Sequence, residues 1–246
     1  MGDVHGHRDV LVRLLRDAGL VDERERWRGA DARLWLVGDL FDRGPDGIGS
    51  LELVRTLERD SSGNVACLLG NHEAMLVAAR RFGREESSFG GYTFHDVWKL
   101  NGGVDADLAA LTDEHVDWIT GLPPIGRDGE WLVLHADTNA YAGFGRPAEV
   151  ATSTRETLRA GDAGGVDDLL GMLSDRQRLD DPGTVDALLA AFGGTRILHG
   201  HTPIASVLDV DPRAVTKPLV YEHGRVMNVD HCLFAGGSGF VVRLDE

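Results

Sequence analysis

Short apolar runs in this chain end repeatedly at a glycine that is followed by a carboxylate, an amide or an imidazole. The runs cover residues 34–37, 65–69 and 195–199, and they lead into Gly38-Asp39, Gly70-Asn71 and Gly200-His201. Helical patterns follow the first two runs, at residues 48–57 and 74–81. A repeated order of buried strand, glycine loop and helix predicts a parallel sheet with crossover helices. Ligands in such sheets bind at the carboxyl ends of the strands, so these polar side chains are expected to converge.

The rest of the chain fits one domain of the α/β class over residues 1–246. A helix is expected at residues 10–18, and a further buried strand at residues 131–134 leads into His135. Residues 84–124 are predicted to form a partly helical insertion. Residues 138–192 are expected to be loops with helices near 166–173 and 185–192, and short alternating segments at 205–208, 219–221, 226–229 and 240–244 predict an antiparallel closing sheet.

Composition excludes several classes of function. The formal net charge is −15, which argues against non-specific binding of nucleic acid, because that binding needs Lys and Arg against the phosphates. No apolar run approaches the roughly 20 residues that cross a membrane, and no export signal is seen, so a cytoplasmic location is predicted. The two cysteines, Cys67 and Cys232, are expected to be small core residues rather than a disulfide or a metal site.

Four polar motifs carry the candidate chemistry. They read Gly-Asp-Val-His-Gly at residues 2–6, Gly-Asp-Leu-Phe-Asp-Arg-Gly at 38–44, Gly-Asn-His-Glu at 70–73 and Gly-His-Thr-Pro at 200–203. Their oxygen and nitrogen donors are those that divalent metals prefer. Asp3 and His5 lie two residues apart and would point the same way, and Asp39 suits a bridge between two ions. The predicted metal ligands are Asp3, His5, Asp39, Asn71, His135 and His201, enough for two ions about 3.5–4 Å apart.

Such a centre predicts hydrolysis of phosphate esters. A water bridging the ions would be largely hydroxide at neutral pH and would attack phosphorus in line. Arg43 can bind the phosphate through its planar fork. His72 would protonate the leaving oxygen as a general acid, and Asp42 would orient His72 and favour its protonated form.

Each residue alone has a simpler interpretation. Asp39 after a strand can be only a turn, the Asp42-Arg43 pair can be a surface ion pair, and His135 can be a core histidine. All of these would have to coincide in this order to imitate a metal site. The remaining histidines are expected to be structural, with His7 and His231 the strongest exceptions because they adjoin a motif or a glycine-rich segment; this set is His7, His95, His115, His199, His223 and His231.

At its motifs the chain resembles the calcineurin-like metallophosphoesterases, in particular the phosphoprotein phosphatase branch with its GDxHG, GDxxDRG and GNHE blocks. The segments at residues 68–75 and 200–203 resemble bacterial-type and Shewanella-like phosphatases. The resemblance implies a β-sandwich flanked by helices, with two ions that are usually manganese, iron or zinc. It implies that Asp3, His5 and Asp39 hold one ion. Asp39, Asn71, His135 and His201 would hold the other, with Arg43 and Asn71 also on the phosphate and His72 paired with Asp42 as the acid.

Three departures qualify this resemblance. Ala136-Asp137 follows His135 where the family has small residues, which places an acidic group at the site edge. The second phosphate-binding arginine of the family is matched by Arg176, without the usual tryptophan. The family's first motif follows a central apolar strand, whereas only Met1 precedes Gly2; the N-terminal strand is therefore expected to be truncated, with the true start upstream.

The leading hypothesis is a dinuclear phosphatase acting on phosphomonoesters, most directly phosphoserine and phosphothreonine in proteins. The main enzymatic alternative is symmetrical cleavage of dinucleoside polyphosphates such as diadenosine tetraphosphate, and other small phosphate esters remain open. A scaffold that has lost its chemistry is the non-enzymatic alternative, disfavoured because no ligand of the motifs is missing. No nucleic-acid or membrane partner is predicted.

Overall fold

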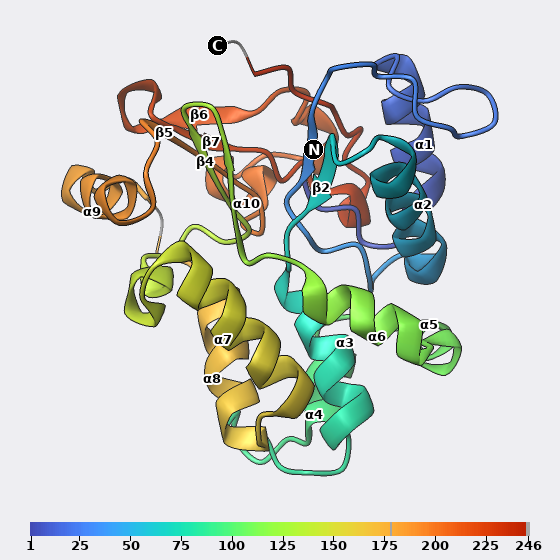
Figure 1. The fold of residues 1–246 in the computed structure, drawn as a ribbon, viewed down its shortest axis with the longest axis vertical. Coiled ribbons are helices and arrows are strands. Elements are labelled where there is room, and N and C mark those ends of the chain that lie inside the picture. The colour runs from blue at the N-terminus through green and yellow to red at the C-terminus, as the bar shows by residue number, and fades with distance from the viewer. Residues whose placement is uncertain (178, 245–246) are drawn as a thin grey trace.

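Two β-sheets form the centre of the computed structural model, which describes residues 1–177 and 179–244 (Figure 1). The smaller sheet pairs β1 (Leu34–Leu36) and β2 (Val65–Cys67) in parallel. The larger sheet has the order β3-β4-β5-β7-β6. Its strands are β3 (Ile125–Asp128), β4 (Trp131–Leu134), β5 (Arg196–His199), β6 (Leu219–Tyr221) and β7 (Val226–Asn228). Strands β4, β5 and β7 run parallel, and β3 and β6 close the two edges in the antiparallel direction.

Helices surround the sheets. The α-helices are α1 (Arg8–Asp17), α2 (Gly47–Asp60), α3 (Asn71–Phe82), α4 (Phe94–Leu100), α5 (Asp105–Ala110), α6 (Asp113–Gly121), α7 (Pro147–Ala160), α8 (Ala163–Ser174), α9 (Pro182–Phe192) and α10 (Ile204–Leu208). Short 3-10 turns are η1 (Ala140–Phe144), η2 (Pro212–Ala214), η3 (Glu222–Gly224) and η4 (Leu233–Ala235). Figure 1 shows α1 and α2 beside the small sheet and helices α3 to α8 grouped below both sheets. This mixed α/β architecture confirms the predicted fold class.

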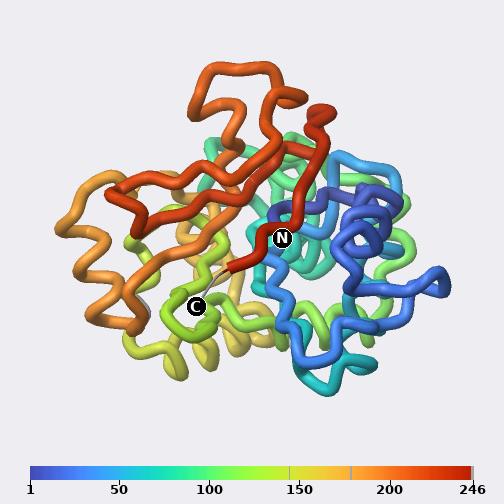
Figure 2. Tube along the Cα trace, turned by 90° about the horizontal axis from the view of Figure 1, so that it is seen from above, coloured from blue at the N-terminus to red at the C-terminus, as the bar shows by residue number. Residues whose placement is uncertain are grey.

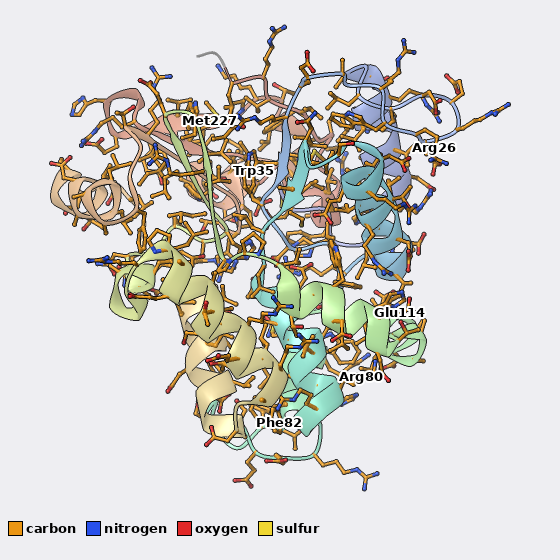
Figure 3. All side chains as sticks on the ribbon, in the orientation of Figure 1. Arg26, Trp35, Arg80, Phe82, Glu114 and Met227 are labelled. Carbon is orange, nitrogen blue, oxygen red and sulfur yellow. The ribbon has the colours of Figure 1, made fainter. Side chains whose placement is uncertain are left out.

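An apolar layer fills the space between the sheets. Its buried members are Val37, Leu68, Trp131, Val133, Leu198 and Val229. Trp35 of β1 and Met227 of β7, both labelled in Figure 3, pack against the same layer. The C-terminal segment completes the layer through Phe240, Val242 and Leu244, and Figure 2 shows it returning toward the N-terminal end of the chain. The sheets are thereby fixed at a distance that leaves their carboxyl ends close together.

The first residues of the chain lie alongside β1. The amino group of Met1 donates to the carbonyl of Trp35, and the amide of Val37 donates to the carbonyl of Met1. Further along, the amides of Val4 and His5 both donate to the carbonyl of Asp39. These backbone bonds place the first motif directly beside the second.

Most elements lie where the sequence predicts them, with three corrections. Residues 204–208 are helical rather than a strand, because Pro203 precedes a stretch whose Ile204 and Ala205 turn inward together. Residues 240–244 are extended and pack by alternate side chains, but they form no ladder and so no strand. Helix α7 replaces a predicted loop; its signal was Pro147 at the first turn with buried residues at four-residue spacing, Val150, Thr154 and Leu158. Among the described residues, none of the helices is both long and apolar enough to cross a membrane.

Candidate active site

Four of the predicted metal ligands lie shortly after the ends of strands. Asp39 lies just beyond β1, Asn71 opens α3 after β2, and His135 and His201 follow β4 and β5. All four side chains are buried. Parallel strands end on the same edge, so residues up to 162 positions apart in the chain meet there.

One cluster, the His135 group, consists of Asp39, His135 and His201 with Asn71 beside them. Ligand atoms of the first three lie within 4.8 Å of one another. The ring of His135 is held by Nδ1, which contacts the carbonyl of Val37 at 2.8 Å. Its Nε2 is then 3.0 Å from Asn71 Oδ1 and 3.4 Å from Asp39 Oδ1. With Nδ1 protonated by this backbone contact, Nε2 presents its lone pair to the cluster.

A second cluster, the His5 group, consists of His5, Asp39 and His72, which also fall within 4.8 Å. His5 is oriented in the same way as His135, since its Nδ1 contacts the carbonyl of Phe41 at 3.0 Å. Its Nε2 lies 3.8 Å from Asp39 Oδ2. Asp39 therefore belongs to both groups, which is the geometry expected of a bridging carboxylate.

Asp3 lies outside both groups. Its buried carboxylate accepts the backbone N–H of His201, at 3.2 Å to Oδ1 and 3.0 Å to Oδ2. Its role as a ligand stays a prediction. In this structure it links the first motif to the last one.

The electrostatics of the site suit divalent cations. Burial, followed by the repulsion of neighbouring carboxylates, raises the pKa of Asp3 and of Asp39 well above the ordinary value. Burial also lowers the pKa of His5 and His201, and that of His135 to about 3, so these imidazoles are neutral and able to bind a metal. Positive charge placed here would favour the ionised carboxylates.

An unpaired atom supports the same fit. His201 Nδ1 is buried and has no hydrogen-bond partner among the described residues, whereas its Nε2 contacts the carbonyl of Ser174 at 3.1 Å. A buried ring nitrogen without a partner is costly unless it binds a ligand. The donor set and this free nitrogen therefore fit a metal centre held by the two groups.

The backbone around the site is strained. Several predicted site residues have left-handed conformations that L-residues rarely adopt, namely His5, Asp39, Asp42, Arg43 and His201. Two motif glycines permit close approach: a Cβ at Gly70 would lie 2.2 Å from Asp39 Oδ1, and one at Gly200 would lie 2.2 Å from Asp3 Oδ1. Glu73 secures the loop, because its carboxylate accepts the amides of Asp39, Leu40 and Gly70.

His72 forms a close pair with Asp42. The distance from His72 Nδ1 to Asp42 Oδ2 is 2.7 Å, and both side chains are buried. Burial, reinforced by the charge of Arg43, lowers the pKa of His72 well below its ordinary value, and burial raises the pKa of Asp42 to about 7. The contact places Asp42 where it could orient His72, and that role stays a prediction; burial outweighs the charge of Asp42 and keeps the pKa of His72 low.

Arg43 extends its guanidinium into the His5 group. Nη1 lies 3.0 Å from His5 Nε2 and Nη2 lies 3.1 Å from His72 Nε2. Phe234 of η4 packs under this guanidinium, with its ring centre 4.3 Å from the central carbon. The exposed Arg176 lies at the other side, where Nη2 contacts the carbonyl of His201 at 3.4 Å. The two predicted phosphate-binding arginines thus approach the two groups from different directions.

Sequence reasoning missed three further side chains at the site. Asp230 follows β7 and is buried near Asp3, Asp39 and both arginines; burial raises its pKa to about 6. The strand-end rule that selected Asp39 would have found it. Phe234 and Trp98 carried no such signal, since each reaches the site from a loop or helix distant in sequence.

The other sequence expectations for this region have mixed outcomes. Asp137 is buried and accepts the hydroxyl of Thr202, so it is tied to the last motif. His199 contacts the hydroxyl of Tyr221 at 2.8 Å and is a member of neither group. His231 is buried beside Phe240 with no hydrogen-bond partner for either ring nitrogen among the residues described.

Comparison with known proteins gives a consistent result. A family model described as calcineurin-like phosphoesterase matches residues 1–235. The symmetrical bis(5'-nucleosyl)-tetraphosphatase of Dechloromonas aromatica is 32% identical over 168 residues, covering 66% of this chain and 51% of that protein. The corresponding protein of Pseudomonas entomophila is 40% identical over 65% of this chain and 49% of its own length. The chain thus spans about half the length of these relatives.

Phosphatases are also among the similar proteins. Serine/threonine-protein phosphatase 1 of Salmonella typhimurium is 26% identical over 85% of this chain and 80% of that protein. The solved structure of a cold-active protein-tyrosine phosphatase from a psychrophilic Shewanella species has a TM-score of 0.67 at 23% identity, covering 96% of this chain and 71% of the other. At this identity the structural likeness supports the fold alone.

Proposed function

The chain belongs to the calcineurin-like phosphoesterase family, and from that membership we propose that it hydrolyses phosphomonoesters at the paired groups around Asp39. It is a hydrolase of this family, and the phosphomonoester substrate is what we propose. The observation that carries the proposal is the position of Asp39 between the His135 group and the His5 group. Arg43 and Asp42, the proposed phosphate-binding residue and the proposed partner of the acid, both contact His72 beside these groups.

Divalent ions would be held by Asp39 with His135, His201 and Asn71 on one side and with His5 and Asp3 on the other. We propose manganese, with iron or zinc as alternatives, because the donors are a mixture of carboxylate, amide and imidazole. When bound, these ions polarise the phosphoryl oxygens and lower the pKa of bound water.

The chain's own side chains supply the remaining steps. Arg43 binds the phosphate and offsets charge on the transferring group, with Arg176 as a second contact. A phosphate must draw the guanidinium of Arg43 away from His72 Nε2. His72 Nε2 is then free to give a proton to the leaving oxygen, and Asp42 keeps the ring in place through Nδ1.

The substrate class that we favour is phosphoserine and phosphothreonine in proteins, as the motif resemblance implies. A second candidate is symmetrical hydrolysis of dinucleoside tetraphosphates. It is favoured by the tetraphosphatase relatives and by the half-exposed ring of Phe234 beside Arg43, which offers a stacking surface for a base. A cytoplasmic location stays a prediction from the sequence.

Two assays test the proposal. Hydrolysis of p-nitrophenyl phosphate by the purified chain, first treated with chelator, should require added manganese; no manganese-dependent turnover by a folded, metal-loaded sample would refute a phosphoesterase role. Phosphopeptides and diadenosine tetraphosphate are then compared by kcat/KM. A higher kcat/KM for the dinucleotide would replace the protein phosphatase assignment with the second candidate.

A further inference from the structure

The end of helix α4 lies directly against the loop that carries Asp42 and Arg43. We name residues 98–104 the Trp98 segment. It belongs to the partly helical insertion and is separated by more than 50 positions from the loop that it contacts. It contributes none of the motif residues, so its contacts require a separate explanation.

Trp98 binds Asp42 through a side-chain hydrogen bond. The indole Nε1 donates to Asp42 Oδ1 at 2.9 Å, and the opposite carboxylate oxygen, Oδ2, contacts His72 Nδ1 at 2.7 Å. The backbone N–H of Val104 donates to the same carboxylate. Trp98 and Asp42 are both fully buried, so solvent does not compete for these bonds. The carboxylate of Asp42 is therefore bonded to the Trp98 segment through one oxygen and to the imidazole of His72 through the other.

The same segment fixes Arg43. The amide of Arg43 donates to the carbonyl of Gly102 at 2.8 Å, and its Nε donates to the carbonyl of Asn101 at 3.3 Å. A Cβ at Gly102 would lie 2.6 Å from Arg43 Cγ, so this close contact requires glycine. Because Asp42 and Arg43 both have left-handed backbone angles, the loop needs such external contacts to keep its shape.

Contacts within the Trp98 segment hold the indole in place. The indole packs against Gly103, where a Cβ would lie 2.4 Å from the ring. Lys99 lies over the indole and donates to the carbonyl of Gly103 at 2.8 Å, and the side chain of Asn101 donates back to Val97. A rigid donor can define the orientation of the carboxylate that it binds.

We propose that Trp98 is a positioning residue for proton donation: its indole N–H fixes Asp42, and Asp42 in turn aims His72 at the leaving oxygen. The carbonyls of Asn101 and Gly102 hold Arg43 in the matching position for the phosphate. This inference deepens the proposed function and rests on it. In the step concerned, the proton passes from His72 Nε2 to the leaving oxygen as the phosphorus–oxygen bond breaks.

Leaving-group dependence separates positioning from general damage. Trp98→Phe keeps an aromatic ring and removes the donor. Its matched control is Trp118→Phe in α6, which removes the bond from Trp118 Nε1 to Glu58 Oε2 at 2.8 Å without touching the site. With manganese present, Trp98→Phe should lower kcat for an alkyl phosphate on the order of tenfold, a part of the 10²–10⁴ that a general acid supplies. Turnover of p-nitrophenyl phosphate, whose leaving group needs little protonation, should stay within about twofold, and Trp118→Phe should change neither.

A double variant tests whether the effect passes through His72. His72→Ala should show the same substrate dependence more strongly, and Trp98→Phe added to it should cause no further loss. Equal losses on both substrates, or losses that add in the double variant, would overturn the positioning role. If the smaller ring unfolds the protein, 3-benzothienylalanine at position 98 keeps the bicyclic shape without the N–H.

A readout that does not depend on turnover separates this inference from the proposed function. The Nδ1 proton of His72, in its short contact with Asp42, should give a downfield NMR signal that is absent in His72→Ala. Trp98→Phe should shift that signal, whereas Trp118→Phe should leave it in place. An unchanged signal refutes the inference. A shifted signal in a protein without phosphatase activity refutes the proposed function alone.

Discussion

The His135 group and the His5 group share Asp39 and differ in how they are built. In the His135 group each imidazole follows a strand of the five-stranded sheet, and one ring nitrogen of each is held by a backbone carbonyl, which leaves the other for the cluster. In the His5 group, His5 lies in a left-handed loop and His72 lies in the first turn of α3, and the guanidinium of Arg43 lies against both histidines.

This difference implies that the two halves bind ligands differently. Side chains that directly follow paired strands are ordered before any ion arrives, so binding there costs little conformational entropy. The His5 group must first release a cation, Arg43, before a metal ion or a proton can take its place. We therefore expect tighter metal binding at the His135 group and stronger dependence on substrate at the His5 group.

Asp39→Asn should have the largest effect because it weakens both groups at once. Lewis-acid stabilisation by bound ions contributes several kcal/mol, and about 1.4 kcal/mol corresponds to a tenfold change, so activity should fall on the order of 10³-fold or more. Metal content after dialysis, measured by elemental analysis, should drop from two manganese ions per chain to fewer than one.

The control variants for this prediction each replace a histidine of one group and leave the other group intact. His135→Ala should lose the tightly bound ion first, whereas His5→Ala should lose the weaker one. If Asp39→Asn still retains two ions, Asp39 is not the bridge. If the two histidine variants lose the same ion, the distinction between the groups is wrong.

Replacing Arg43 tests whether its guanidinium competes with a metal ion for the nitrogens of His5 and His72. Arg43→Ala should lower kcat/KM by about 10²–10³-fold, the usual result of removing one preorganised donor from a transition state. It should also tighten manganese binding, because a competing cation has left His5 Nε2 and His72 Nε2. Titration calorimetry of the metal-free protein measures the second effect.

Arg43→Lys is the matched variant, since it keeps the charge and loses the planar fork. It should restore part of the phosphate binding and none of the bidentate geometry. Weaker manganese binding in Arg43→Ala would show that the arginine supports the metal site rather than competing with it.

Sequence reasoning succeeded where a strand ends and failed where contacts span the fold. Asp39 and His135 were found because an apolar run followed by a polar residue predicts a strand end. The contact of Asp3 with the His201 amide, 198 positions away, depends on where β5 lies and has no local signal. The bond from Trp98 to Asp42 is of the same kind. By contrast, helix α7 could have been predicted, since Pro147 and the spacing of its apolar residues mark it.

Arg176 should matter less than Arg43 because it is exposed. An exposed charge pair contributes about 0.2–1 kcal/mol, so Arg176→Ala should raise KM about two- to fivefold and leave kcat nearly unchanged. Initial rates over a range of phosphopeptide concentrations give both constants. A large fall in kcat would place Arg176 in the transition state and make the arginines of the two sides equivalent.

The smallest expected effect is on stability, and it distinguishes His201 of the His135 group from the buried His231, which belongs to neither group. His201 has one unpaired ring nitrogen beside Asp39 and His135, whereas His231 has two and lies in neither group, among the residues described. Burial, followed by the N-terminal ammonium, lowers the pKa of His231 to about 3. Its unfolded value is about 6.5, so between these values the unfolded chain binds more protons and stability falls as the pH decreases.

His231→Leu should remove this acid sensitivity. From pH 7.5 to 5.0 the group contributes about 2 kcal/mol of lost stability, or roughly 4–8 °C in Tm for a chain of this size. The drop in Tm between pH 7.5 and 5.0 should therefore be smaller in His231→Leu than in the wild type. Manganese should raise the Tm of His231→Leu as much as that of the wild type but raise that of His201→Leu less. An equal drop in Tm in His231→Leu and the wild type would show that His231 does not cause the acid sensitivity. Loss of the manganese effect in His231→Leu would show that His231 also supports metal binding.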